Sequence, residues 1–146
     1  MRVKKIIFLL VFCFLSFICV ADDVFGYGTW VGIVKNNTVQ FFTQNKRSWE
    51  NVTISEIVLT AGYKNVFGVG AAIGVIYNDT IQFFVPNKTY TAFERASNMD
   101  MSLSEGYKSV FGGISGAIGV AYNNTIQFFQ KKDSHWEHIP FLDFVK

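Results

Sequence analysis

The chain has 146 residues, and its 13 Lys and Arg against 11 Asp and Glu give a net charge of only +2, without the clustered basic residues that phosphate binding requires. This composition argues against a nucleic-acid partner and against binding to an acidic membrane surface. Half of the residues are hydrophobic and 16 are Phe, which is more than the core of a monomer of this size usually needs.

The chain begins with a segment typical of a secretory signal peptide. Three basic residues precede an apolar run over 6–20, and the small residue Ala21 follows. We predict cleavage after Ala21 and a secreted or periplasmic location. The run is short for a transmembrane span, which needs about 20 apolar residues, so we expect no stable membrane insertion after cleavage.

Removal of 1–21 would change the chemistry of what remains. Both cysteines, Cys13 and Cys19, belong to the predicted leader, so 22–146 would depend on core packing or assembly instead of disulfides. Ten Lys and Arg would then stand against eleven Asp and Glu, a net charge near −1. A lipoprotein anchored through Cys19 is an alternative, although it requires small residues where Phe17 and Ile18 stand.

Residues 22–146 are expected to form one domain made of three copies of a repeat of about 42 to 44 residues. Each copy has a Val-Phe-Gly triplet, a short β-branched segment and the sequence Asn-(Asn/Asp)-Thr-(Val/Ile)-Gln-Phe-Phe. A polar loop and an aromatic residue followed by Glu come next. The copies extend over about 24–65, 66–109 and 110–146.

Each repeat is predicted to form about four short strands. In the first copy, 31–35 is β-branched and apolar, 38–42 is the return strand, and Asn36-Asn37 between them suits a tight hairpin because Asn adopts positive φ at low cost. One further strand begins near each aromatic-Glu pair, and another lies at each Val-Phe pair. One helical turn is expected over 99–103.

Two features of the predicted strands indicate close packing. The strand at 126–129 carries large apolar residues on both faces, and so do its equivalents, which predicts sheets covered on both sides. A glycine inside the preceding strand of each copy predicts a close backbone approach or a bulge. These glycines are Gly32, Gly74 and Gly119.

Residues 71–84, Ala-Ala-Ile-Gly-Val-Ile-Tyr-Asn-Asp-Thr-Ile-Gln-Phe-Phe, resemble a hemopexin-type β-propeller blade, as do 124–129 running on to Trp136. Lectin-type and Kelch-type blades share this outline. The resemblance implies an all-β fold of propeller blades. Hemopexin-type domains have four blades, a closing disulfide and an acidic residue where Gly70 and Gly116 stand here. Neither their central ion site nor their haem-binding role therefore carries over.

The number of repeats raises the question of closure. Propellers typically have four to eight blades, so three blades do not close easily, whereas two chains would make a six-bladed ring. We therefore expect a homo-oligomer. The alternative is a β-trefoil, in which three repeats of this length close as a monomer.

The sequence contains no catalytic constellation, and we expect neither an enzyme nor a cofactor. His135 and His138 are three apart on a predicted strand and face opposite sides, so they do not predict a metal site. One acid recurs at the same position in each copy, seven residues beyond the aromatic residue. Such symmetric acids are interpreted as turn or strand-end residues instead of the unequal pair of a glycosidase. These acids are Glu56, Asp100 and Asp143.

Two sets of residues are candidates for ligand binding. One is the aromatic residue of each copy, which would either stack on a sugar or act as a wedge between blades, and the other is the mid-strand glutamine, which would face a ligand or tie one blade to the next. We expect a binding module for a carbohydrate or protein that uses the loops 43–48, 85–92 and 130–135. The alternative is a structural or self-assembling protein without a small-molecule ligand. The candidates are Trp49, Phe93, Trp136, Gln40, Gln82 and Gln127.

Overall fold

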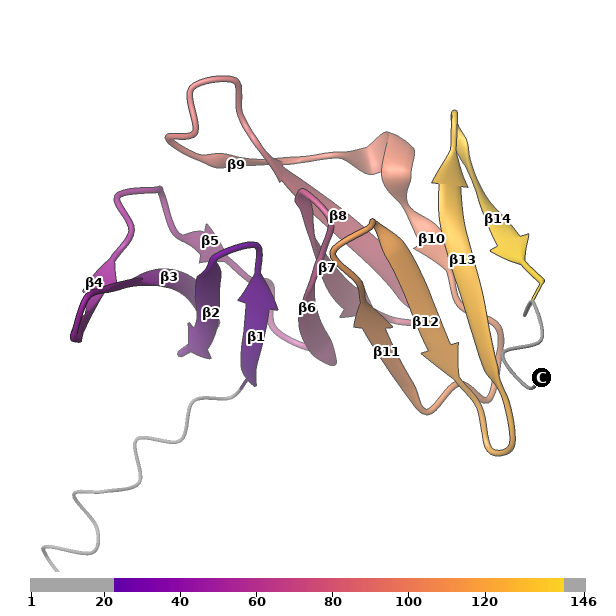
Figure 1. Cartoon of the computed structure of the whole chain (residues 1–146). Coiled ribbons are helices and arrows are strands. Elements are labelled where there is room, and N and C mark those ends of the chain that lie inside the picture. The colour runs from indigo at the N-terminus through magenta and orange to yellow at the C-terminus, as the bar shows by residue number, and fades with distance from the viewer. Residues whose placement is uncertain (1–22, 141–146) are drawn as a thin grey trace, which may run out of the picture.

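A computed structural model describes residues 23–140 (Figure 1). The predicted signal peptide, its cleavage site after Ala21, and Asp143 lie outside these residues. The described chain is all-β, as predicted: it forms three antiparallel sheets, and each sheet is built from one repeat. Its one helical element is a short 3-10 turn, and no helix in 23–140 is long and apolar enough to cross a membrane.

The first sheet has the strand order β1-β2-β3-β4, and the short β5 pairs with β3. The second sheet has the order β10-β8-β7-β6, and β9 pairs with β8. The strands of the first sheet are β1 (Asp23–Tyr27), β2 (Trp30–Lys35), β3 (Thr38–Asn45), β4 (Ser48–Asn51) and β5 (Ile57–Val58). Those of the second are β6 (Asn65–Val69), β7 (Ala72–Tyr77), β8 (Thr80–Pro86), β9 (Phe93–Arg95) and β10 (Met101–Ser102).

The third sheet is a simple four-stranded meander in the order β11-β12-β13-β14. Every strand pairing in the described chain joins strands of the same repeat, and none of the sheets closes on itself. The strands are β11 (Ser109–Gly112), β12 (Ala117–Ala121), β13 (Ile126–Lys132) and β14 (His135–Ile139).

The central hairpins of the first two sheets turn where the sequence predicts. Asn36 and Asn37 have φ values of 51° and 58°, and Asn78 and Asp79 have values of 42° and 65°. Positive φ at both central residues is the geometry of a type I′ turn, which Asn and Asp tolerate. The third sheet differs, because pairing ends at Ala121 and Ile126 and leaves a wider connection.

The helical turn expected over 99–103 is misplaced. A 3-10 turn, η1, occupies Ser97–Met99, whereas Met101 and Ser102 form β10 and pair with Ile81 and Thr80. Met101 is apolar and buried, so pairing with β8 determines its conformation more strongly than local propensity does. The sequence analysis did not anticipate the short strands β5 and β10.

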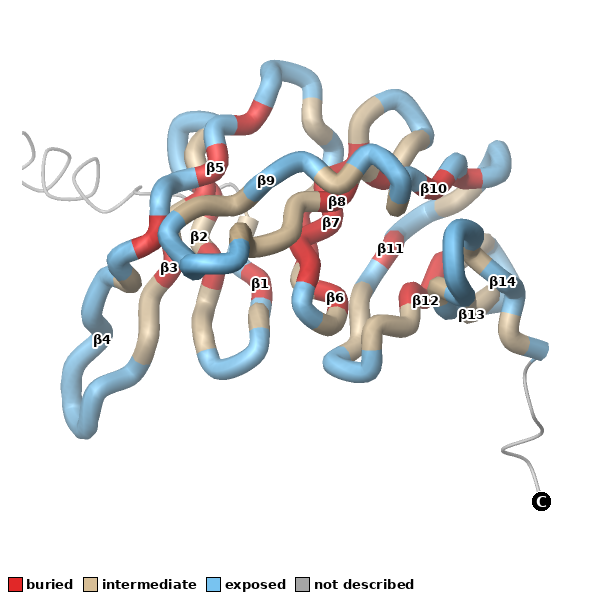
Figure 2. The backbone as a smooth tube through the Cα atoms, turned by 90° about the horizontal axis from the view of Figure 1, so that it is seen from above, coloured by how far each residue is buried: buried red, intermediate tan, exposed pale blue. Residues whose placement is uncertain are grey.

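The three sheets are stacked with their first strands side by side, and β6 lies between β1 and β11 (Figure 1). One apolar cluster fills the space between the first and second sheets, and another fills the space between the second and third. The second sheet is therefore covered on both faces, and 72–76 in β7 is entirely buried (Figure 2). The prediction of two covered faces holds for this sheet.

The glycines predicted to permit close backbone approach have another role. Gly32, Gly74 and Gly119 each lie under the phenyl ring of a residue on the neighbouring strand, and a Cβ at any of them would overlap that ring. The covering rings are Phe25, Phe67 and Phe111.

The close backbone approach occurs instead at the glycine of each Val-Phe-Gly triplet. A Cβ at Gly68 would overlap the carbonyl oxygen of Gly26, and a Cβ at Gly112 would overlap that of Gly68. Just beyond this contact, the Gly70 N–H donates to Gly113 O at 2.9 Å. Glycine at these positions allows the first strands of neighbouring sheets to touch through their backbones.

Candidate functional site

The aromatic residues that precede Glu in the second and third repeats lie between sheets. Phe93 stacks on Phe41 of the first sheet, with ring centroids 5.0 Å apart and an interplanar angle of 29°. Trp136 stacks in the same way on Phe83 of the second sheet, at 5.2 Å and 25°. Trp49 holds the equivalent position in the first sheet, which has no preceding sheet in the described chain, and it is 57% exposed.

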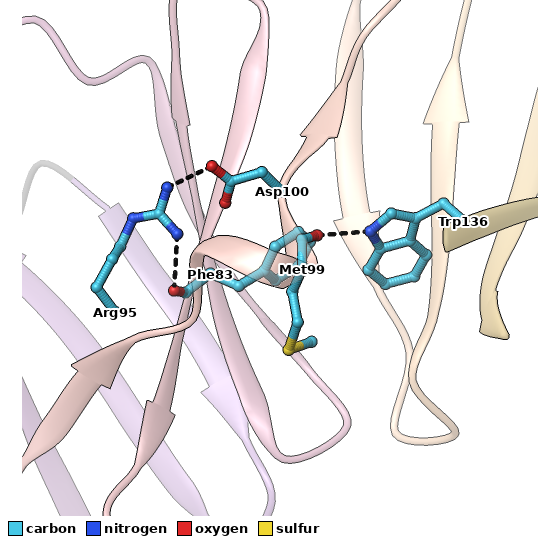
Figure 3. Close-up of polar contacts among 5 residues, drawn as sticks. All are labelled: Phe83, Arg95, Met99, Asp100 and Trp136. Carbon is cyan, nitrogen blue, oxygen red and sulfur yellow. Dashed lines mark hydrogen bonds and ion pairs between the residues drawn. The ribbon is translucent and has the colours of Figure 1, made fainter. Parts of the chain in front are cut away.

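Trp136 is fixed in position by the segment that contains η1. Its Nε1–H donates to Met99 O at 2.6 Å (Figure 3). The same segment is held on its other side by Arg95, whose guanidinium pairs with Asp100 at 2.5 Å and donates to Phe83 O at 3.5 Å. The Trp136 bond joins the third sheet to the second, and the Arg95 contacts hold the accepting segment in place within the second repeat.

The loop between β8 and β9 has a defined conformation that depends on Asn87. Its Oδ1 accepts a hydrogen bond from Thr91 N at 2.9 Å, and its carbonyl oxygen accepts one from Tyr90 N at 3.0 Å. Tyr90 has a φ of 55°, which is uncommon for a bulky residue, and the Asn87 turn holds it there. The Tyr90 ring is consequently presented to solvent, with 65% of the residue exposed.

A cleft of about 500 Å³ lies between the second and third sheets at this end of the molecule. Its lining includes Tyr90 from the loop between β8 and β9, Lys131 near the end of β13, and Trp136 on β14. The loop expected over 130–135 is therefore mostly strand, and only 133–134 connect β13 to β14. Lys131 Nζ donates to Asn98 O at 3.3 Å, which positions its charge at the edge of the cleft. Aromatic surface with a few placed polar groups is the usual make-up of a ligand site. The segments 85–92 and 130–135 are both predicted contact regions, but no signal in the sequence distinguishes Tyr90 and Lys131 within them.

The predicted glutamines occupy equivalent positions on β3, β8 and β13 and are half-buried. Gln40 Nε2 donates to Glu56 Oε1 at 2.5 Å, so this pair links two candidates within the first repeat. Among the described residues, no hydrogen bond joins Gln40, Gln82 and Gln127 to one another. The structure therefore does not bring the three amides together.

The remaining polar candidates are separate from the cleft. Asp100 pairs with Arg95, and His135 and His138 lie exposed on β14, where the His138 ring makes an edge contact with Phe129. Within 23–140 no group of three or more His, Cys, Asp or Glu residues is arranged to hold a metal ion.

A second cavity, of about 480 Å³, lies at the opposite end of the sheets, near the Asn-Asp turn of the second repeat. Here Lys64 Nζ bonds Asp79 Oδ1 at 2.8 Å and approaches the Tyr107 hydroxyl at 3.4 Å. The hydrogen bond to Asp79 raises the pKa of Lys64, and the same bond lowers the pKa of Asp79. The pair is largely exposed. Because Asp79 is a turn residue, the contact stabilises the turn.

No family model, curated protein or solved structure matches this chain.

Proposed function

We propose that this chain is an exported, non-enzymatic binding module whose three sheets are propeller-like blades and whose repeat loops recognise a carbohydrate or protein ligand. Pairing within each repeat and the meander order of the strands support blades in preference to the trefoil. The adjacent first strands, in backbone contact at Gly68 and Gly112, correspond to the inner strands of a propeller. The candidate acids support a non-enzymatic role, since Glu56 and Asp100 each bond a side chain of their own repeat.

The observation that carries the binding proposal is the cleft between the β8–β9 loop and the hairpin of β13 and β14. It combines the exposed Tyr90 ring, the Lys131 ammonium group and one edge of Trp136. A rigid aromatic group and a charge, presented by loops on a packed scaffold, suit recognition of a sugar ring or an extended peptide. Trp49 is a second exposed aromatic candidate, whereas Phe93 and Trp136 are stacked against neighbouring sheets.

A glycan array probed with the exported chain tests this proposal. We expect a retained glycan, and we expect Tyr90→Ala and Lys131→Ala each to weaken its binding by roughly tenfold or more, about 1.4 kcal/mol. Val58→Ala is the matched control, because Val58 is exposed and lies outside the cleft. Equal binding by all three variants would place the ligand elsewhere, and no retained glycan would leave a protein ligand or self-assembly as the function.

The alternative function, a self-assembling protein without a small ligand, is favoured by a separate observation. The faces of the first and third sheets that are directed away from the second sheet expose large apolar residues. The residues at equivalent positions in the other sheets are buried.

A further inference from the structure

We propose that two copies of this chain associate head to tail, with the outer face of the first sheet in one copy covering the outer face of the third sheet in the other. The two contacts would close a ring of six sheets. The proposal goes beyond ligand binding and does not depend on the cleft. It rests on the two inter-sheet contacts that already exist within one chain.

The third outer face is the side of the third sheet directed away from the second, formed by Phe111, Ala117, Ala121, Ile126 and Phe128. Its equivalents in the first two sheets are almost fully buried, because the next sheet covers them: Val39 and Ile81 are both 0% exposed. Ile126, at the same position, is 46% exposed, and Phe111 is 43% exposed.

The rings of the third outer face already have the arrangement found inside the molecule. Phe111 and Phe128 meet edge to face at 6.2 Å and 81°, and Phe25 and Phe41 do so at 6.3 Å and 87°. The third sheet thus carries the same apolar surface as the first, in the same geometry. In the first two sheets, the next sheet of the same chain covers this surface. For the third sheet, the first sheet of another copy would do so.

The first outer face is the side of the first sheet directed away from the second, formed by Val24, Val31, Ile33, Phe42 and Trp49. Val24 is 63% exposed, whereas its equivalents Val66 and Val110 are 3% and 4% exposed because they pack on a preceding sheet. Trp49 is likewise exposed, whereas its equivalents Phe93 and Trp136 stack on preceding sheets.

The two outer faces are complementary because the chain repeats. Phe93 stacks on Phe41 and Trp136 stacks on Phe83, so the equivalent contact between copies would bring Trp49 of one copy against the third outer face of the other. Both faces carry large apolar side chains, with Gln40 and Gln130 among them, and this apolar surface would leave water together, which is the main favourable term in such association.

Gly26 supplies a second, independent indication that another copy packs against the first outer face. A Cβ at Gly68 or Gly112 would overlap the carbonyl oxygen of the preceding glycine, but a Cβ at Gly26 would meet nothing within 4 Å. Gly26 is also absent from the residues with positive φ, so neither local space nor backbone conformation requires glycine there. A requirement would arise if Gly26 of one copy touched the Gly112 carbonyl of another.

The number of copies follows from the number of sheets. Head-to-tail contacts make rings if the rotation closes and open filaments if it does not. Propellers have about four to eight blades, so of the multiples of three only six, from two chains, falls within that range. A closed dimer would also cover both outer faces, leaving neither of them open for further growth.

Light scattering behind a sizing column, applied to the exported chain, tests the proposal. We expect the mass of two chains. Gly26→Ala should convert the dimer to a monomer with an unchanged circular dichroism spectrum, because the added methyl group has space within one copy and overlaps the Gly112 carbonyl of the other. Ile126→Glu should also abolish the dimer, from the opposite face.

Val58→Glu is the control for Ile126→Glu, because it adds the same charge to an exposed apolar residue. Val58 is 78% exposed, and its equivalent Ser102 stays exposed although the second sheet is covered, so position 58 lies outside the proposed contact. A ladder of larger masses, or a dimer that persists in Gly26→Ala and Ile126→Glu, would overturn the proposal. A single-chain mass for the unsubstituted protein would also overturn it.

Discussion

At the scale of single residues, the contact between Lys64 and Asp79 shows how one ion pair can stabilise a turn. Asp79 occupies the second turn position with a φ of 65°, and its carboxylate accepts a hydrogen bond from Lys64 at 2.8 Å. This bond lowers the pKa of Asp79 from its ordinary value of 3.8 and raises the pKa of Lys64 from 10.5. Both groups are exposed to solvent, so the contribution to stability is small.

The signs of these two pKa shifts predict a pH dependence. The Asp79 contribution is present above pH 3.8 and is lost as the pH falls through the lowered value, and the Lys64 contribution is present below pH 10.5 and is lost as the pH rises through the raised value. Asp79→Asn keeps a residue that tolerates positive φ but removes the charge. We expect it to lower Tm slightly at neutral pH and to match the unsubstituted protein in acid. A Tm difference that stayed constant across this range would contradict the assignment.

At the scale of elements, the sequence predicts the central hairpins well and the short outer segments poorly. The turns at Asn36 and Asn78 are favoured locally, because Asn-Asn and Asn-Asp pairs tolerate the positive φ of a type I′ turn. The pair at 123–124 does not adopt positive φ, so local preference alone does not decide the turn. The conformation of Met101 is not local. It belongs to a strand because β8 offers it an edge and an apolar site, and a short sequence window contains no sign of either.

The same distinction explains which parts of the candidate site were anticipated. The repeat pattern identified the aromatic positions, and both interpretations of them, wedge and ligand contact, were physically sound. Only the stacking of sheets shows that Phe93 and Trp136 lie between sheets and that Trp49 does not. The cleft at Tyr90 and Lys131 depends on a loop and a strand from different repeats, so no pattern within one repeat predicts it.

The element formed by η1 and Trp136 gives a prediction about stability. Trp136→Phe keeps an aromatic ring on Phe83 but loses the hydrogen bond to Met99 O, so it should cost about 0.5–1.5 kcal/mol. Trp136→Ala loses the stacking as well and should cost about 3 kcal/mol, near the low end for truncating a large aromatic residue because Trp136 is only half-buried. Urea denaturation measures both. Equal costs would mean that the ring contributes little and that the hydrogen bond dominates.

At the scale of the whole molecule, the core lies between sheets, not inside any one of them. Each sheet is a single layer, so it becomes stable only when another sheet covers its apolar face. The second sheet has neighbours on both sides, whereas the first and third each have one. Stability should therefore decrease outward from β7, and assembly through the outer faces would reduce that gradient.

Hydrogen exchange measured at several protein concentrations tests this distribution. Amides of β7 should exchange most slowly at every concentration, because the residues around them are buried within one chain. Amides of β2, β3, β12 and β13 should become more protected as the concentration rises, since pairing of two copies covers the outer faces of these strands. In Gly26→Ala this dependence on concentration should disappear while the protection of β7 remains. Protection of β12 and β13 that was as high as that of β7 at the lowest concentration, and the same in the variant, would show instead that the third outer face is covered within a single chain.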